Sequence, residues 1–182
     1  MYKRQVPAYV EQFNYVRSLS ARIDTLSWTP VYTPDRYTAI PYLTNDFSFK
    51  RTFARDGRDK FVQFKTTALV NQEITDVAVE FLDKGLLGRR GVLDMLNVGY
   101  TAGVYLNKTI QDYGLELQDT YVRLDRDIAR LLDEIDKKVG LANTVVFLTS
   151  TGYFKGEAKE SPIYNIPSVS YTHLTLPTNS RV

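Results

Sequence analysis

The longest regular pattern in the chain is an apolar stripe that runs from Glu116 to Gly140. Apolar side chains recur there at steps of three and four residues, which predicts an amphipathic helix: Leu117, Tyr121, Leu124, Ile128, Leu131, Leu132, Ile135 and Val139. The opposite face carries pairs of opposite charge four residues apart, such as Asp119 with Arg123 and Arg123 with Asp127. Gly140 fits a C-terminal cap. We expect the charged face to be solvated and not to form a binding site.

An apolar segment lies on each side of this helix. Val92–Tyr100 is mostly apolar and Thr144–Leu148 is rich in β-branched side chains, so that both are typical of buried strands. A strand, a helix and a second strand with short joints predict a right-handed βαβ unit. The predicted fold class is therefore α/β, with a mostly parallel sheet flanked by helices. This sheet would be incomplete, and its open edges would favour aggregation.

Two further helices are expected earlier in the chain. Loose helical spacing after Pro7 predicts the first over about Ala8–Leu19. The second is predicted over about Asn71–Asp83, with Asn71 as its N-cap and Gly85 as its stop.

Residues from about 28 to 65 are expected to form a lid-like insertion. The first part contains three prolines, which exclude a regular helix. The second part, Leu43–Lys65, is rich in phenylalanine and basic residues, and Asp56-Gly57 predicts a hairpin turn. Such a segment could stack on single-stranded nucleic acid, face a phosphate as a lid, or form a β-rich surface whose phenylalanines pack inward. We favour the inward-packed surface.

Both ends of the chain resemble translated sequencing-adapter DNA. Residues 1–5 (MYKRQ) match one reading of a transposase library adapter, and residues 169–178 (VSYTHLTLPT) match a reading of its reverse complement. A natural disordered tail is the alternative for the C-terminal end. We expect residues 1–5 and 168–182 to be artefacts and residues 6–167 to be a fragment of one domain.

Removing these ends changes the charge of the chain. Its 23 basic and 21 acidic residues give a net charge of +2. Three basic residues, Lys3, Arg4 and Arg181, lie in the end segments, so that the remainder has a net charge of −1. A basic excess that would support nucleic-acid binding is then missing. The remaining sequence also has no apolar run long enough to span a bilayer.

The same removal restricts the possible chemistry. The single histidine, His173, lies in the C-terminal segment, and the chain has no cysteine. Residues 6–167 therefore cannot form a His/Cys zinc site, a cysteine nucleophile or a Ser-His-Asp triad.

Several segments resemble the alkaline phosphatase superfamily. The most specific is DTYVRLDRDIA at 119–129, followed by VG at 139–140 and VFLT at 146–149. VPAYV at 6–10, WTP at 28–30 and TPDRYTA at 33–39 add support. The resemblance covers nearly all of residues 6–152 and is greatest to the periplasmic phosphatases and phosphodiesterases of Bacteroidetes. It implies two zinc ions, a Thr or Ser nucleophile outside this chain, and a location in the periplasm or cell envelope.

Four positions depart from the metal-binding pattern that the resemblance implies. In the family the strand after the central helix ends in Ala-Asp-His-Gly, but Thr151 stands here at the Asp position and Gly152 at the His position. A second Asp/His pair corresponds to Val104 and Lys108. Valine cannot ligate zinc, glycine offers only its backbone, and a lysine ammonium group repels a dication. We therefore predict no catalytic residue, no metal and no cofactor for this fragment, although the family uses zinc.

The sequence-based hypothesis is a non-catalytic member of the superfamily. It would bind a phosphorylated or other anionic small molecule, with Lys108 as the candidate anion contact, and no nucleic acid. The first alternative is an active phosphate-ester hydrolase with a rearranged or metal-poor site. The second is a nucleic-acid-binding module built on Lys50–Lys65, whose binding would depend steeply on salt.

Overall fold

The computed structural model describes residues 6–33, 36–37, 48–53, 59–108 and 110–150. Its contacts divide the chain into two units, Met1–Phe147 and Leu148–Val182, and the elements below all lie in the first. Of the described residues, 58% are helical and 3% lie in strands. None of the described helices is both long enough and apolar enough to cross a membrane.

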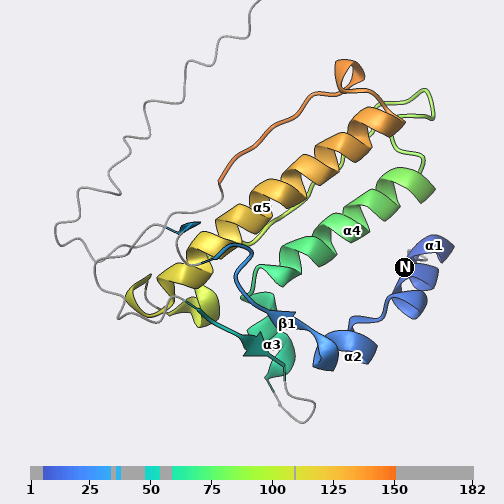
Figure 1. Ribbon diagram of the computed structural model, residues 1–182. Helices are drawn as coiled ribbons and strands as arrows, with labels where there is room; N and C mark the ends of the chain where they lie inside the picture. The colour runs from blue at the N-terminus through green and yellow to red at the C-terminus, as the bar shows by residue number, and fades with distance from the viewer. Residues whose placement is uncertain (1–5, 34–35, 38–47, 54–58, 109, 151–182) are drawn as a thin grey trace, which may run out of the picture. The chain divides into compact units, whose positions relative to one another are not determined.

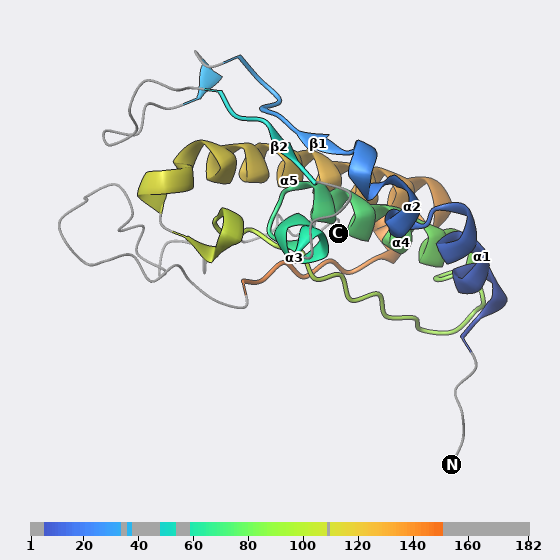
Figure 2. The same cartoon turned by 90° about the horizontal axis from the view of Figure 1, so that it is seen from below.

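Two long helices form the main body of the first unit. Helix α4 spans Leu69–Lys84 and helix α5 spans Ile110–Lys138. They lie side by side and run in the same direction, and the chain between them returns without regular structure through most of its length (Figures 1 and 2). This arrangement places one face of α5 against α4.

The two predicted helices in this region are confirmed, with corrections at their ends. Helix α4 begins two residues before the predicted start, and its N-cap position is held by Ala68, so the predicted cap at Asn71 is wrong. Helix α5 begins at Ile110 and has an irregular residue at Tyr113 (φ −134°, ψ 34°). Its end is as predicted, because Gly140 adopts φ +86° and donates its N–H to backbone oxygens of the last turn.

The N-terminal helix is shorter than predicted. Helix α1 spans Ala8–Val16 and is followed by the short helix α2 at Leu19–Arg22 and the 3-10 turn η1 at Ile23–Thr25. The break comes at Arg17, whose backbone (φ −113°, ψ 33°) leaves the helical region. Its guanidinium forms an ion pair with Asp76 of α4 at 2.5 Å. The end of α1, which the local apolar periodicity did not predict, thus coincides with an ion pair to a distant helix.

The predicted α/β fold with a parallel sheet is wrong for the described chain. Its sheet consists of β1 (Ser27–Trp28) and β2 (Arg51–Thr52), which pair antiparallel. The segments Val92–Tyr100 and Thr144–Leu148 form no strand, and no described segment lies beside them as a ladder partner. β-propensity reflects packing on a paired, half-buried surface rather than a backbone preference. An apolar run without a neighbouring strand therefore remains extended chain.

The side chains of these two segments are correspondingly exposed. Leu93 is 101% exposed and Met95 is 87% exposed. Val145 and Phe147 are 78% and 88% exposed. These residues were predicted to be buried, and the first unit provides no surface that covers them among its described residues.

The core lies where the N-terminal segment meets the beginnings of α4 and α5. One cluster is centred on Trp28 and contains Tyr37, Phe49, Ala68, Tyr105 and Leu115. A second cluster joins Ile23 to Phe53 and to Phe64 of helix α3 (Lys60–Lys65). The rings of Trp28 and Phe49 meet edge to face, with centroids 5.0 Å apart.

The expectation that the phenylalanine-rich segment packs inward is confirmed for three residues. Phe49, Phe53 and Phe64 are at most 8% exposed, whereas Phe61 is 39% exposed. The segment contributes helix α3 and the two-residue strand β2 rather than a β-rich surface. The hairpin predicted at residues 56–57 lies outside the described residues, and the lid-like role of residues 28–65 stays a prediction.

Asn71 supports the chain that returns from α4. It is fully buried within α4. Its side-chain amide donates to the Thr101 carbonyl oxygen at 2.7 Å and accepts from the Thr101 N–H at 2.8 Å. The Asn71 side chain thus satisfies the backbone N–H and carbonyl groups of Thr101, which a neighbouring strand would satisfy in a sheet.

Replacing Asn71 by alanine is expected to lower the free energy of unfolding by about 2 kcal/mol, because two backbone groups of Thr101 lose their partner. Chemical denaturation measures the change. The matched control is Gln72→Ala, the exposed neighbour on the same helix, which should lose well under half as much. Equal losses in the two variants would contradict the supporting role of Asn71.

Candidate functional site

The structure describes two of the four positions at which the family resemblance places metal ligands. Val104 is 7% exposed and precedes the 3-10 turn η3 (Tyr105–Asn107). Lys108 follows this turn and is exposed. Thr151 and Gly152 lie outside the described residues. A buried isopropyl group and an exposed ammonium group do not fit a zinc site, and within the described chain no three His, Cys, Asp or Glu side chains converge as metal ligands would.

The most highly bonded polar side chain in the same region is Asp119 of α5. Its carboxylate is fully buried. It accepts from the Trp28 indole Nε1 at 2.6 Å, the Val31 backbone N–H at 2.7 Å, the Tyr37 hydroxyl at 2.7 Å and the Arg123 Nε at 2.7 Å. Four donors, one of them a cation, meet the hydrogen-bonding capacity of a buried carboxylate. Asp119 therefore fixes Trp28, Val31 and Tyr37 against α5.

Two of these partners are held in turn by the same segment. The Tyr37 hydroxyl accepts from the Tyr32 backbone N–H at 3.1 Å while it donates to Asp119. Burial, followed by the hydrogen bond to Asp119, raises the pKa of Tyr37 above its ordinary value of 10.0. Arg123 also donates from Nη2 to the Thr29 carbonyl oxygen at 2.7 Å. The network is thus neutral as a whole, because one guanidinium offsets one carboxylate.

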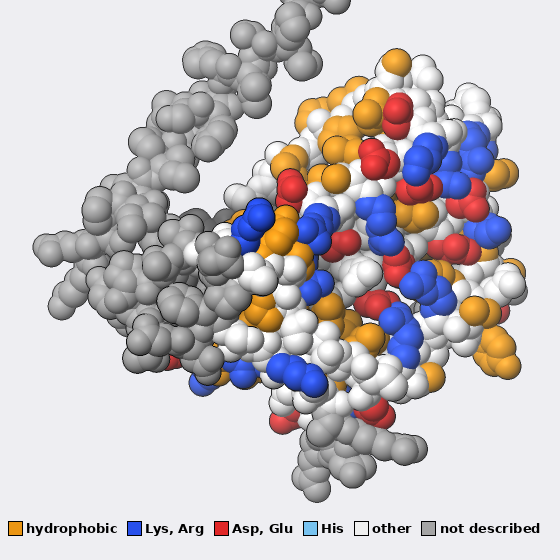
Figure 3. All heavy atoms as spheres, in the orientation of Figure 1, with side chains coloured by type: hydrophobic (Ala, Val, Ile, Leu, Met, Phe, Trp, Pro, Cys, Tyr) orange, Lys and Arg blue, Asp and Glu red, His pale blue; other side chains and the backbone are white. Residues whose placement is uncertain are grey.

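The prediction that the charged face of α5 is solvated is wrong for part of that face, whereas Asp133 and Lys137 near its end are exposed. Glu116, Asp119 and Asp127 are buried on the side of α5 that faces the rest of the first unit. Glu116 pairs with Arg51 of β2, while Arg130 of α5 pairs with Asp76 of α4, each at 2.5 Å. The predicted Asp119–Arg123 pair is confirmed at 2.7 Å, whereas Arg123 forms no ion pair with Asp127 within the described residues. Basic and acidic side chains alternate over the face in Figure 3.

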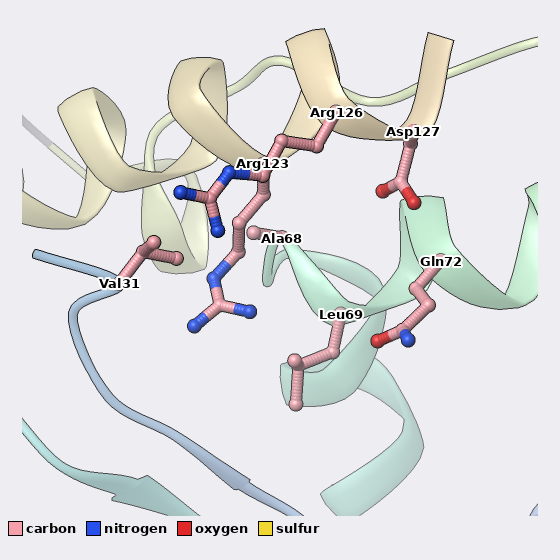
Figure 4. A pocket seen from close by; sticks show the side chains of 7 residues that line it. All are labelled: Val31, Ala68, Leu69, Gln72, Arg123, Arg126 and Asp127. Atoms are coloured by element: carbon pink, nitrogen blue, oxygen red, sulfur yellow. The ribbon is translucent and has the colours of Figure 1, made fainter. Parts of the chain in front are cut away.

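A pocket of about 200 Å³ opens between the beginning of α4 and the middle of α5. The residues that line it come from both helices and the segment after β1: Val31, Ala68, Leu69, Gln72, Arg123, Arg126 and Asp127. Figure 4 shows the guanidinium groups of Arg123 and Arg126 beside each other on the side of Val31. The Asp127 carboxyl group and the Gln72 amide both lie at the opposite side, one on α5 and the other on α4. This pocket is the candidate functional site.

The guanidinium group of Arg126 lines the pocket and is not neutralised by an ion pair with any described residue. Its guanidinium lies over the Tyr32 ring, 5.0 Å from the ring centroid. A ring contact of this kind orients a guanidinium without neutralising it. Within the described residues no carboxylate pairs with Arg126, whereas Arg123 is paired with Asp119. The two arginines together therefore give this side of the pocket an excess of one positive charge.

Asp127 is in a less favourable environment. It is 9% exposed and accepts no hydrogen bond from any described residue. Burial raises the pKa of Asp127 above its ordinary value of 3.8, Arg130 and Arg123 oppose this shift, and the like charge of Asp76 adds to it. The carboxylate oxygens of Asp127 are not among the buried unpartnered atoms of the described residues, so that a donor can reach them from the pocket that Asp127 lines.

Replacing Asp127 by asparagine is expected to raise the free energy of unfolding by about 1 kcal/mol near neutral pH, because a buried charge is removed. Since the folded-state pKa of Asp127 is raised, its contribution favours the folded state at low pH and is lost as the pH rises through that pKa. The advantage of the variant should therefore shrink toward pH 3.8. Denaturation curves over this pH range measure it, and a difference that does not change with pH would contradict the expectation.

The sequence predicts only part of this pocket. Its charge pattern places Arg123 and Asp127 on a solvated helix face and predicts no site role for Gln72 or Arg126. Lys108, the predicted anion contact, does not line the pocket, and its proposed role stays a prediction. A signal was present, because residues 116, 119, 120, 123 and 127 recur at steps of three and four and so share one face of α5.

Most of the chain is similar in sequence to known proteins. It is 27% identical over 160 residues to the alkaline phosphatase PafA of Elizabethkingia meningoseptica and 27% identical over 159 residues to the alkaline phosphatase PhoV of Synechococcus elongatus. The chain is distantly related to alkaline phosphatases. A protein of Myroides odoratus named as a calcium-transporting ATPase is 29% identical over 163 residues.

All three relatives are much longer than the region that matches this chain. Each of the three matches covers 82% of this chain but only 29% of the relative. No protein-family profile matches the chain, and no solved structure matches it significantly. The resemblance found in the sequence is thus confirmed as a distant, partial relation to alkaline phosphatases.

Proposed function

We propose that this protein is a non-catalytic relative of the alkaline phosphatases that binds a phosphorylated or other anionic small molecule. The observation that carries the proposal is the pair of guanidinium groups of Arg123 and Arg126 at one side of the pocket. Guanidinium groups are suited to phosphate and carboxylate ligands, because their planar donors match the spacing of the oxygen atoms. On the same distant relation we propose a location in the periplasm or cell envelope, and a kinship with the periplasmic phosphatases and phosphodiesterases of Bacteroidetes.

The departure from the metal-binding pattern supports the absence of catalysis. Zinc-dependent hydrolysis of phosphate esters requires ligands that hold the metal close to the reacting phosphate. The Val104 side chain has no donor atom, and the ammonium group of Lys108 is not a zinc ligand. Thr151 and Gly152 depart from the pattern in the sequence. We therefore derive no hydrolytic step for this chain.

Binding of inorganic phosphate to the 182-residue protein tests the proposal directly. Titration calorimetry should show binding that Arg126→Gln weakens about tenfold, as expected for the loss of one charged hydrogen-bond donor. Lys137→Gln, at an exposed position near the end of α5, is the matched control. Lys108→Gln decides whether that residue also contacts the anion. Undetectable phosphate binding by the unaltered protein would refute anion binding.

The alternative of an active hydrolase with a rearranged site is tested by turnover. An aryl phosphate and an aryl phosphodiester, each with and without added zinc, should be hydrolysed no faster than in buffer. Zinc-dependent turnover would overturn the non-catalytic proposal and leave anion binding untouched.

A further inference from the structure

The pocket between α4 and α5 has opposite charges at its two sides. The guanidinium groups of Arg123 and Arg126 lie toward Val31, and the Asp127 carboxyl group lies on the far side near the Gln72 amide (Figure 4). The side chains of Ala68 and Leu69 lie between them as an apolar part of the lining. A ligand that fills the pocket would therefore contact positive and negative groups at once.

Asp127 shows what such a ligand must supply. The residue is 9% exposed, and no described residue donates a hydrogen bond to its carboxylate. The Nε of Arg123 donates instead to Asp119, and its Nη2 donates to the Thr29 carbonyl oxygen. Arg130 is paired with Asp76 at 2.5 Å. Asp127 lines the pocket, so that a ligand there can supply the donor.

A cationic donor fits this position better than a neutral one. Burial disfavours the charged form of Asp127, and the nearby arginines Arg130 and Arg123 offset this only in part. An ammonium group would stabilise the charged form further and donate a charge-assisted hydrogen bond, whereas a hydroxyl group would donate only a neutral one. The Gln72 amide oxygen can accept a second hydrogen bond from the same ammonium group.

The size of the pocket limits the ligand to a small molecule. Its volume is about 200 Å³, whereas pockets for drug-sized ligands are about 300–1,000 Å³. One water molecule takes about 30 Å³ in the liquid, so that the pocket corresponds to a compound of a few heavy atoms. An anionic group and an ammonium group joined by a short linker fit this space.

We propose that the pocket binds a small amphoteric molecule, with its phosphate or carboxylate group at Arg123 and Arg126 and its ammonium group at Asp127 and Gln72. This inference rests on the proposed function, anion binding in the same pocket, and specifies the class of the ligand. The arginine side supplies affinity for the anion. Asp127 distinguishes a ligand with an amine from a simple phosphate or carboxylate.

Matched pairs of ligands test this inference on the 182-residue protein. Titration calorimetry compares 2-aminoethyl phosphate with ethyl phosphate, and 3-aminopropanoate with propanoate. The amine-bearing member of at least one pair should bind about tenfold or more tightly than its partner, as expected for one additional charged contact. The pair with the larger effect identifies the anion as phosphate or carboxylate.

Two variants locate the effect. Asp127→Asn should abolish the preference for the amine and raise the affinity for the amine-free anion, because a negative charge is removed from the pocket. Arg126→Gln should weaken both members of a pair about equally. Lys137→Gln, outside the pocket, should change neither. Circular dichroism and thermal melts of each variant establish that it is folded.

The outcomes separate this inference from the function on which it rests. Equal affinity for both members of each pair would overturn the amphoteric ligand and keep anion binding. A preference for the amine that survives Asp127→Asn would place the ammonium group elsewhere and overturn the assignment to this pocket. Failure of all four compounds to bind would overturn both proposals.

Discussion

Replacing Asp119 by alanine is expected to lower the free energy of unfolding by about 3–5 kcal/mol, the effect of removing one partner of a buried charged network. The change leaves the Trp28 indole, the Val31 N–H, the Tyr37 hydroxyl and the Arg123 guanidinium without their shared acceptor. Since whole domains are stable by only about 5–15 kcal/mol, the variant should lose much of its folded population at 37 °C.

The tryptophan provides a direct measurement of this effect. Trp28 is the single tryptophan of the chain and is 0% exposed. In Asp119→Ala its fluorescence emission should shift to longer wavelength, and its unfolding midpoint in denaturant should fall. Asp119→Asn tests the charge separately, because the amide keeps the volume but accepts fewer hydrogen bonds. It should be destabilised less than the alanine variant.

The matched control for Asp119 is Asp125→Ala on the exposed face of the same helix. Exposed charges on a helix contribute a few tenths of a kcal/mol, so this variant should unfold close to the unaltered protein. A loss below about 1 kcal/mol for Asp119→Ala would contradict the central role of the carboxylate. So would equal losses for Asp119→Ala and Asp125→Ala.

Placing charges on the exposed apolar segments is the second change with a large expected effect. Leu93 and Phe147 are 101% and 88% exposed, and both lie in segments without a described ladder partner. Exposed apolar side chains beside open backbone groups favour association between chains. The double variant Leu93→Lys, Phe147→Lys should remain monomeric to at least about tenfold higher concentration than the unaltered protein, because each charge opposes apolar contact.

Sedimentation velocity and light scattering over a concentration series measure this association. Tyr15→Lys is the matched control, because Tyr15 is 89% exposed and belongs to α1, not to either segment. That variant should associate like the unaltered protein. Association unchanged by the double substitution would show that these segments are not the contact surfaces.

The motif that resembles the phosphatase superfamily is also the motif that builds the site. Asp119, Arg123, Arg126 and Asp127 all belong to the segment DTYVRLDRDIA at 119–129. In the structure this segment holds the Trp28 region to α5 and lines the pocket. The segment that is most specific to the resemblance thus also supplies both arginines of the proposed anion site.

The sequence by itself determined the two long helices of this protein. A helix is stabilised by hydrogen bonds between residues four apart, so a stripe of apolar residues at three- and four-residue steps locates α4 and α5. The stop of α5 at Gly140 is also local, because glycine adopts the left-handed conformation without strain. These features need no knowledge of distant residues.

Only the tertiary structure decided the sheet, the buried charges and the pocket. A strand requires a neighbour, and the segments Val92–Tyr100 and Thr144–Leu148 have none among the described residues, so their apolar composition did not become a sheet. The burial of Asp119 depends on Trp28, 91 residues away in the sequence. The local sequence around a charged helix residue does not show whether its side chain faces solvent or packs against distant residues. Only the tertiary structure therefore distinguishes the buried Asp119 and Asp127 from the exposed charges of the same helix.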